Sequence, residues 1–235
     1  MARVNLGQLR TALGVLTRLP FDEERPGEGD LSLPLVLAAG LVGLAGAIAG
    51  GLCGWLGGPV AGALLGGLLV PTSLWWLTRG RGLQALYAVV QGTGTGLGRA
   101  DELSLRMAAF HALLLLKMLC TGLLVGAGAA LWLFIAWLLA GVVLADEWAA
   151  REGSGTAGRL PWLVVGVGCI LAGGCLGQFV GALFLTVLVW LGLPVLRRWL
   201  APRCELPGYA FTWLLVEVAE TVVLLLAVLI VFAPR

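Results

Sequence analysis

The chain has 235 residues, of which 60% are hydrophobic and only 12% are charged, and its mean hydropathy is +0.99. Soluble domains carry about 25% charged residues, so this composition excludes a soluble globular protein and predicts an all-α integral membrane protein. The formal net charge of +2 gives no reason to expect a nucleic-acid partner, because membrane topology already explains where the arginines lie.

The first element that the sequence predicts is an amphipathic helix over residues 4–19. At about 100° per residue, four leucines fall within one narrow arc of this helix: Leu6, Leu9, Leu13 and Leu16. We expect it to lie flat on the cytoplasmic surface of the membrane; a soluble amphipathic helix packed on the loops is the alternative. The acidic stretch FDEERPGEGD, residues 21–30, then forms a solvated linker within a cytoplasmic region over residues 1–33.

Residues 34–235 are expected to form a single transmembrane domain, a compact bundle of about seven helices. The apolar stretches that predict these spans are 34–56, 59–77, 107–128, 129–145, 161–177, 178–196 and 210–232. Almost nothing polar separates the members of the first three pairs, which predicts tight hairpins. Glycines recur at four-residue spacing in three ridges: Gly46, Gly50 and Gly54; Gly58, Gly62 and Gly66; Gly173, Gly177 and Gly181. This spacing favours close helix packing, within the chain rather than between copies.

The arginines predict the orientation of the bundle. If the N-terminus is cytoplasmic, 13 of the 14 arginines lie in cytoplasmic segments and only Arg235 lies outside. Positive charge is enriched in the cytoplasmic segments of membrane proteins. We therefore expect a multi-pass protein of the bacterial inner membrane with a cytoplasmic N-terminus and an external C-terminus.

Two carboxylates in the last span are candidate catalytic residues. Glu217 and Glu220 are three residues apart and share one helical face, roughly 10–15 Å from the cytoplasmic start of the span. Carboxylates at that depth are costly unless they are protonated, paired or hydrated. They are either functional groups or structural partners of Lys117 or of an arginine at the inner rim, and the sequence leaves both readings open.

Two weaker candidates precede them. The run GTGTGLGR begins at Gly92, and the backbone amides around Gly92, Gly94 and Gly96 could cradle a phosphate. It lacks the G-K-[ST] ending of a P-loop and follows no predicted strand, so a flexible loop is the better interpretation. His111 is the chain's one histidine, which excludes a multi-histidine metal site and favours a hydrogen bond between helices.

Several segments match one family of membrane enzymes. The opening LRTALGVLTRLPF is similar to the family pattern L-x-x-A-L-x-F-L-T-R-L-P, and the match continues through LPLVLAAGLVGLAGAI to Leu77, Thr78 and Gly80. Lys117 matches a membrane lysine, Glu217 and Glu220 match an E-x-x-E motif, and Ala150 to Gly153 weakly resemble an A-R-x-x-G loop that contains Arg151. On these residues the chain resembles the cobalamin synthase family, which joins a phosphorylated base nucleoside to a GDP-activated corrinoid. The resemblance implies binding roles for Lys117 and Arg151.

The chain departs from this family in the catalytic loops. The family reads G-x-H-x-D-G-x-x-D-x-x-D-G, but here Gly82 replaces the histidine, and the three aspartate positions are occupied by Gln84, Ala88 and Gln91. The K-D-S-R-x-G stretch that precedes the membrane lysine is deleted. In the family the aspartates are expected to hold magnesium against the diphosphate. No metal site and no cofactor are therefore expected here.

The sequence thus supports two hypotheses. The first is a pseudoenzyme, a degenerate cobalamin synthase-like protein that serves as a non-catalytic scaffold or as a subunit among other membrane proteins. The second is an active adenosylcobinamide-GDP ribazoletransferase with a rearranged site, which would use magnesium and a corrinoid nucleotide substrate. The first is favoured because the divergence is concentrated in the catalytic loops.

Overall fold

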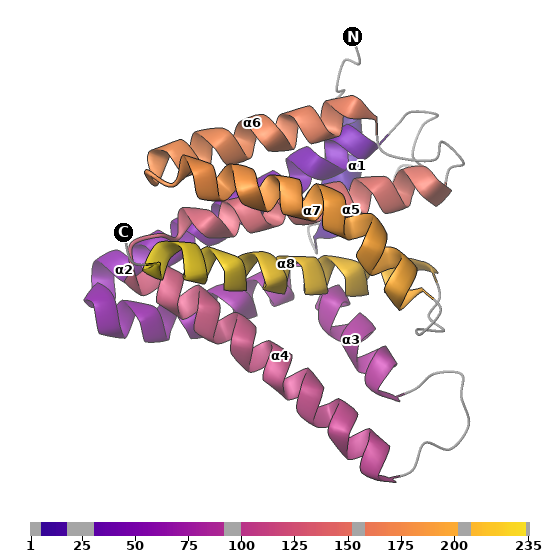
Figure 1. Ribbon diagram of the computed structural model, residues 1–235, viewed down its shortest axis with the longest axis horizontal. Coiled ribbons are helices and arrows are strands. Elements are labelled where there is room, and N and C mark those ends of the chain that lie inside the picture. Colours follow the sequence, from indigo (N-terminus) through magenta and orange to yellow (C-terminus); the bar gives the residue numbers. More distant parts are fainter. Residues whose placement is uncertain (1–5, 18–30, 92–99, 152–157, 202–207, 234–235) are drawn as a thin grey trace.

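The computed structural model describes residues 6–17, 31–91, 100–151, 158–201 and 208–233, and all regular secondary structure in them is helical. The helices are α1 (Leu6–Leu16), α2 (Ser32–Leu77), α3 (Arg81–Gln91), α4 (Ala100–Gly126), α5 (Leu131–Arg151), α6 (Arg159–Cys175), α7 (Phe179–Leu200) and α8 (Gly208–Phe232). The longer helices lie side by side as a bundle, with α3 and the first half of α4 projecting from one side (Figure 1). The predicted acidic linker and the glycine-rich run lie outside the described residues.

Five helices in the described part of the chain are long and apolar enough to cross a membrane: α2, α4 from Met107, α5, α7 and α8. The all-α class is thereby confirmed, with several helices able by length and composition to span a membrane. The number of such helices in this part of the chain is five rather than the predicted seven or so. The first two predicted spans are the two halves of α2, whose 46 residues contain a kink at the non-helical Gly58, and the fifth is the shorter helix α6, with 17 residues.

A sharp bend divides α2 at the point where two spans were expected to separate. Gly58 has φ 64° and ψ −167°, which side-chain-bearing residues rarely adopt, and Pro59 follows it. A Cβ on Gly62 would lie 2.7 Å from the Cα of Gly54, although an unbroken helix would hold these residues about 12 Å apart. The two halves of α2 therefore fold back on each other.

Two further glycine turns join neighbouring helices. Gly128 (φ 70°) ends the connection from α4 to α5, and Gly177 (φ 65°) joins α6 to α7. At the first turn, Ala129 N–H donates to the Leu124 carbonyl at 2.7 Å. At the second, Gln178 N–H donates to the Gly173 carbonyl, also at 2.7 Å. This is the Schellman pattern of helix termination, which satisfies carbonyls that the helix leaves unpaired.

The core is centred on α5, whose apolar window is 78% buried, compared with 11% for α7. Glycines admit the neighbouring helices closely: a Cβ on Gly50 would lie 3.0 Å from Val125, and one on Gly181 would lie 2.8 Å from Ile230. Most glycines of the predicted ridges thus pack within the chain, but Gly58 and Gly177 do not: both have positive φ at turns, and a Cβ on either would meet nothing within 4 Å.

The amphipathic helix α1 joins the same core. Ala12 and Leu16 are fully buried, and Leu9 and Leu13 are half-buried against core residues. Of the four leucines in the predicted arc, Leu6 is exposed. The arc therefore packs mainly against protein, principally against α2.

Candidate functional site

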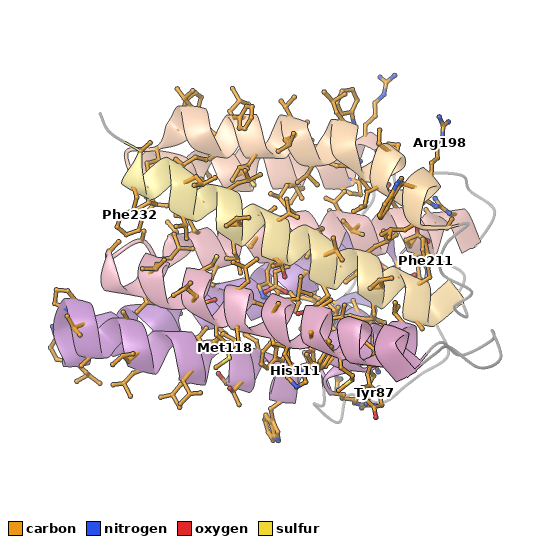
Figure 2. The ribbon with its side chains drawn as sticks, turned by 60° about the horizontal axis from the view of Figure 1, so that its bottom comes forward. Tyr87, His111, Met118, Arg198, Phe211 and Phe232 are labelled. Atoms are coloured by element: carbon orange, nitrogen blue, oxygen red, sulfur yellow. The ribbon has the colours of Figure 1, made fainter. Side chains whose placement is uncertain are left out.

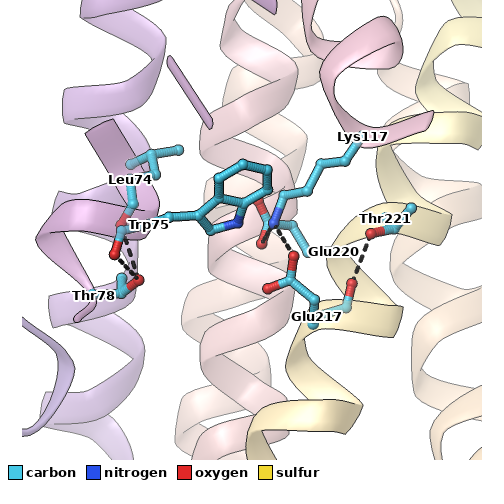
Figure 3. A network of polar contacts seen from close by, with 7 residues as sticks. All are labelled: Leu74, Trp75, Thr78, Lys117, Glu217, Glu220 and Thr221. Carbon is cyan, nitrogen blue, oxygen red and sulfur yellow. Dashed lines mark hydrogen bonds and ion pairs between the residues drawn. The ribbon is translucent and has the colours of Figure 1, made fainter. Parts of the chain in front are cut away.

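The structure brings together three of the predicted site residues from two helices. Lys117 lies in the middle of α4, and Glu217 and Glu220 lie on one face of α8. The Lys117 Nζ donates to Glu217 Oε1 at 2.6 Å and to Glu220 Oε2 at 2.7 Å (Figure 3). All three residues are at least 96% buried. Of the partners that the sequence left open for the two carboxylates, the structure therefore selects Lys117. We call these three residues the buried triad.

The Lys117 ammonium group also lies beside an aromatic ring. The Nζ lies 5.5 Å from the centre of the Trp75 ring, near the end of α2, where a cation–π contact is favourable. Figure 3 shows this ring next to the two carboxylate contacts. Lys117 is only 2% exposed, so its charge is balanced by these described protein groups rather than by solvent.

Two tryptophans around the triad were missed by the sequence reasoning. Trp137 of α5 lies beside Glu220, yet its indole N–H makes no hydrogen bond to any described residue. The buried indole N–H of Trp75 is likewise without a described acceptor. The sequence positions of both tryptophans carry no signal that they would lie beside a buried lysine or its carboxylate partners.

Helix α3 packs directly on this site. A Cβ added to Gly82 would overlap Glu217 Oε2, so any larger residue at this position requires the Glu217 carboxylate to shift. The neighbouring Arg81 guanidinium lies 5.7 Å from the centre of the Trp213 ring on α8. These contacts fix the first turn of α3 against α8, beside the buried triad.

The positions that hold aspartates in the cobalamin synthase family fall on α3 at residues 84, 88 and 91. Their spacing places them on one helical face. Gln84 is exposed and donates from Nε2 to the Arg79 carbonyl at 3.4 Å, whereas Ala88 is half-buried. Within the described residues, no group of three or more His, Cys, Asp or Glu side chains could hold a metal ion.

The remaining candidates do not join the site as described. Gly92, Gly94 and Gly96 lie outside the described residues, and Arg151 is known only as the last residue of α5. His111 is exposed on α4 (Figure 2), with Nδ1 2.7 Å from the Met107 carbonyl oxygen of the same helix. The expectation of a hydrogen bond between helices is therefore wrong for His111.

An ion pair between α5 and α7 was not predicted. Glu147, near the end of α5, is 7% exposed, and its Oε1 lies 3.1 Å from Arg197 Nε on α7, whose side chain is 45% exposed. A carboxylate in the last turns of an apolar span was the available signal for this contact.

Comparisons with protein-family models, with curated proteins and with solved structures find no match to this chain.

Proposed function

We propose that the chain is a non-catalytic, cobalamin synthase-like protein that serves as a scaffold or subunit in a membrane complex. The buried triad is the observation that carries this proposal. Its two carboxylates point at the protein's own lysine, which they hold at 2.6 and 2.7 Å. A closed, buried arrangement of this kind ties α4 to α8, and it directs the three charged groups of the triad at one another rather than at a substrate.

The convergence of the triad also supports the family resemblance. Lys117 is 100 residues from Glu217 and 103 residues from Glu220, and the lysine and the E-x-x-E pair were matched to the family in two different segments. Their contact is compatible with a shared architecture, although charged groups within apolar helices also pair for electrostatic reasons alone.

The surroundings of α3 favour the non-catalytic form over the working enzyme. Gln84 and Ala88 supply no negative charge where the family has aspartates, and a phosphoryl-transfer site needs such charge to hold its metal. Gly82 lies so close to Glu217 that a larger residue, such as the histidine of the family, would displace the Glu217 carboxylate from its present position. The alternative, a working ribazoletransferase with magnesium and a corrinoid nucleotide, would need a different arrangement of this region.

We further propose seven membrane crossings, with each half of α2 and the short helix α6 crossing in addition to α4, α5, α7 and α8. The turns at Gly58, Gly128 and Gly177 support this, because each reverses the chain between two apolar segments. At about 1.5 Å per residue, the 17 residues of α6 span about 26 Å, close to the thickness of the hydrocarbon core. The arginine distribution places the N-terminus in the cytoplasm and the C-terminus outside.

Complementation of a bacterial host that lacks cobalamin synthase tests the proposal. We expect no rescue by this chain, with an authentic synthase as the positive control and membrane expression verified for both. Purified protein should likewise form no cobalamin phosphate from a GDP-activated corrinoid and magnesium. Formation of that product above background would establish the transferase instead. The size of the particle extracted from native membranes, compared with that of the purified chain, tests the subunit part of the proposal.

A further inference from the structure

An apolar groove runs along the contact between α7 and α8. Its volume is about 260 Å³, below the roughly 300–1,000 Å³ of pockets that enclose whole small molecules. Leu188 and Leu196 mark its ends on α7, Val222 and Leu226 line it on α8, and Gly192 and Ala219 are its smallest lining residues. From residue 188 to 196 the groove extends about 12 Å along the helix. These dimensions suit part of one extended hydrocarbon chain.

The groove exists because α7 packs tightly against α8 at one end only. At Gly181 a Cβ would lie 2.8 Å from Ile230, whereas at Gly192 a Cβ would meet nothing within 4 Å. Pro194 lies inside α7 just beyond Gly192, where it removes a helical hydrogen bond and favours a bend. Figure 1 shows α7 changing direction before its C-terminal end. The space beside Gly192 is thus open to whatever surrounds the bundle.

A cation lies at one end of this groove. Arg197 continues the helical ridge of Val189 and Leu193, which line the groove, because these residues are four positions apart. Its Nε lies 3.1 Å from Glu147 Oε1, while its side chain remains 45% exposed. A guanidinium has five N–H donors, so most of them are still available. Trp199, also exposed, follows in the same turn, as expected for a residue at the membrane interface.

We propose that this groove is a binding site for one phospholipid, with an acyl chain along Gly192 and the phosphodiester on Arg197. The chemistry of the groove fits an amphipathic occupant. Its lining is apolar throughout, and the end near Arg197 carries a partly paired guanidinium, a group that binds phosphate oxygens well. Helix α7 is the least buried of the five long helices, so a lipid reaches the groove directly from the bilayer.

Native mass spectrometry of the full chain, purified in detergent and delipidated before phosphatidylglycerol is added back, tests the site. We expect the parent to retain one phospholipid. Gly192→Leu places a side chain at the groove, beginning at a Cβ that meets nothing within 4 Å, and should reduce this retention about tenfold. Gly51→Leu is the matched control, because a Cβ on Gly51 also meets nothing within 4 Å, and it should behave like the parent. Equal retention by these two variants would overturn the proposal.

The arginines provide a second matched set. Arg197→Gln should lower retention about tenfold, the factor that corresponds to one charge-assisted hydrogen bond. Arg198→Gln should have no effect, because Arg198 extends away from the bundle (Figure 2). Glu147→Gln breaks the same ion pair as Arg197→Gln but keeps the guanidinium, so this variant should retain the lipid. Comparing the two variants distinguishes loss of the phosphate contact from destabilisation caused by loss of the ion pair.

Two further outcomes would count against the site. Binding of dioleoylglycerol, which lacks the phosphate, as tightly as phosphatidylglycerol would exclude the phosphate contact. A dimer that disappears in Gly192→Leu, with phospholipid retention unchanged, would show that a second copy of the chain occupies the groove.

Discussion

Lys117 and Glu217 are 100 residues apart in the sequence, yet the Lys117 Nζ and the Glu217 Oε1 are 2.6 Å apart in the fold. Neither side chain is more than 5% exposed. Because Glu220 Oε2 also lies 2.7 Å from the same nitrogen, these contacts make α4 and α8 depend on each other for charge compensation.

Replacing both carboxylates of the triad should therefore destabilise the protein. In the double variant Glu217→Gln, Glu220→Gln, Lys117 stays buried without an anionic partner, which costs about 3–5 kcal/mol. Unfolding by SDS in mixed micelles measures the change. Adding Lys117→Met to the double variant removes the orphaned charge and should restore most of the loss. A double variant as stable as the parent would contradict the pairing.

Magnesium should not stabilise the parent protein. In the structure the two carboxylates bind Lys117, so added magnesium has no reason to raise the midpoint of thermal unfolding in detergent. The measurement compares the parent with Glu217→Gln, Glu220→Gln at matched ionic strength. A magnesium-dependent rise in the parent that the double variant lacks would reveal a metal site and favour the transferase.

Gly82→Ala should weaken the packing of α3 on α8. The added methyl group overlaps Glu217 Oε2, and overpacking of this kind typically costs about 1–3 kcal/mol. The loss is measured by SDS unfolding. Gly51→Ala adds the same atom in open space and should be neutral or slightly stabilising, since alanine favours the helix. If the two substitutions had the same effect, the close contact would be disproved.

Gly58→Ala should destabilise the protein for a different reason. Nothing lies within 4 Å of the added Cβ, but the backbone at φ 64° and ψ −167° is strained for any other residue by about 1–3 kcal/mol. The same unfolding assay applies, again with Gly51→Ala as control. A neutral result would mean that the two halves of α2 are not joined by this turn.

The seven-crossing topology predicts the location of reporter fusions. Fusions after Gly92, Gly155 and Arg203 should read cytoplasmic, and fusions at Gly128, Gly177 and Arg235 should read external. Each position follows from the arginine distribution and from the glycine turns. An external signal from any of the first three would remove this topology.

The sequence predicted the elements of the site better than their assembly. That Glu217 and Glu220 share a face follows from helical periodicity alone. That they meet Lys117, Trp75 and Gly82 depends on how α2, α3 and α4 pack, which local pattern does not encode. The absence of aspartates at residues 84, 88 and 91 of α3 was evident from the sequence itself, because it depends only on which residues occupy these positions.

The span count shows the same limit. Hydropathy located the boundary near Gly58, but it could not show that the chain reverses there through one non-helical residue. In α1, periodicity predicted the leucine arc correctly. It could not say whether Leu9, Leu13 and Leu16 would face lipid or protein, because both surroundings are apolar.

The separation of the triad along the chain also sets an order of events during synthesis. Ribosomes add about 5–20 residues per second, so roughly 5–20 seconds pass between the emergence of Lys117 and that of Glu217, 100 residues later. Throughout that interval α4 carries an ammonium group without its counter-ions. Insertion of α8 therefore supplies the counter-ions that Lys117 in α4 requires. A chain that ends before α8 would expose this uncompensated charge, which quality-control proteases can recognise.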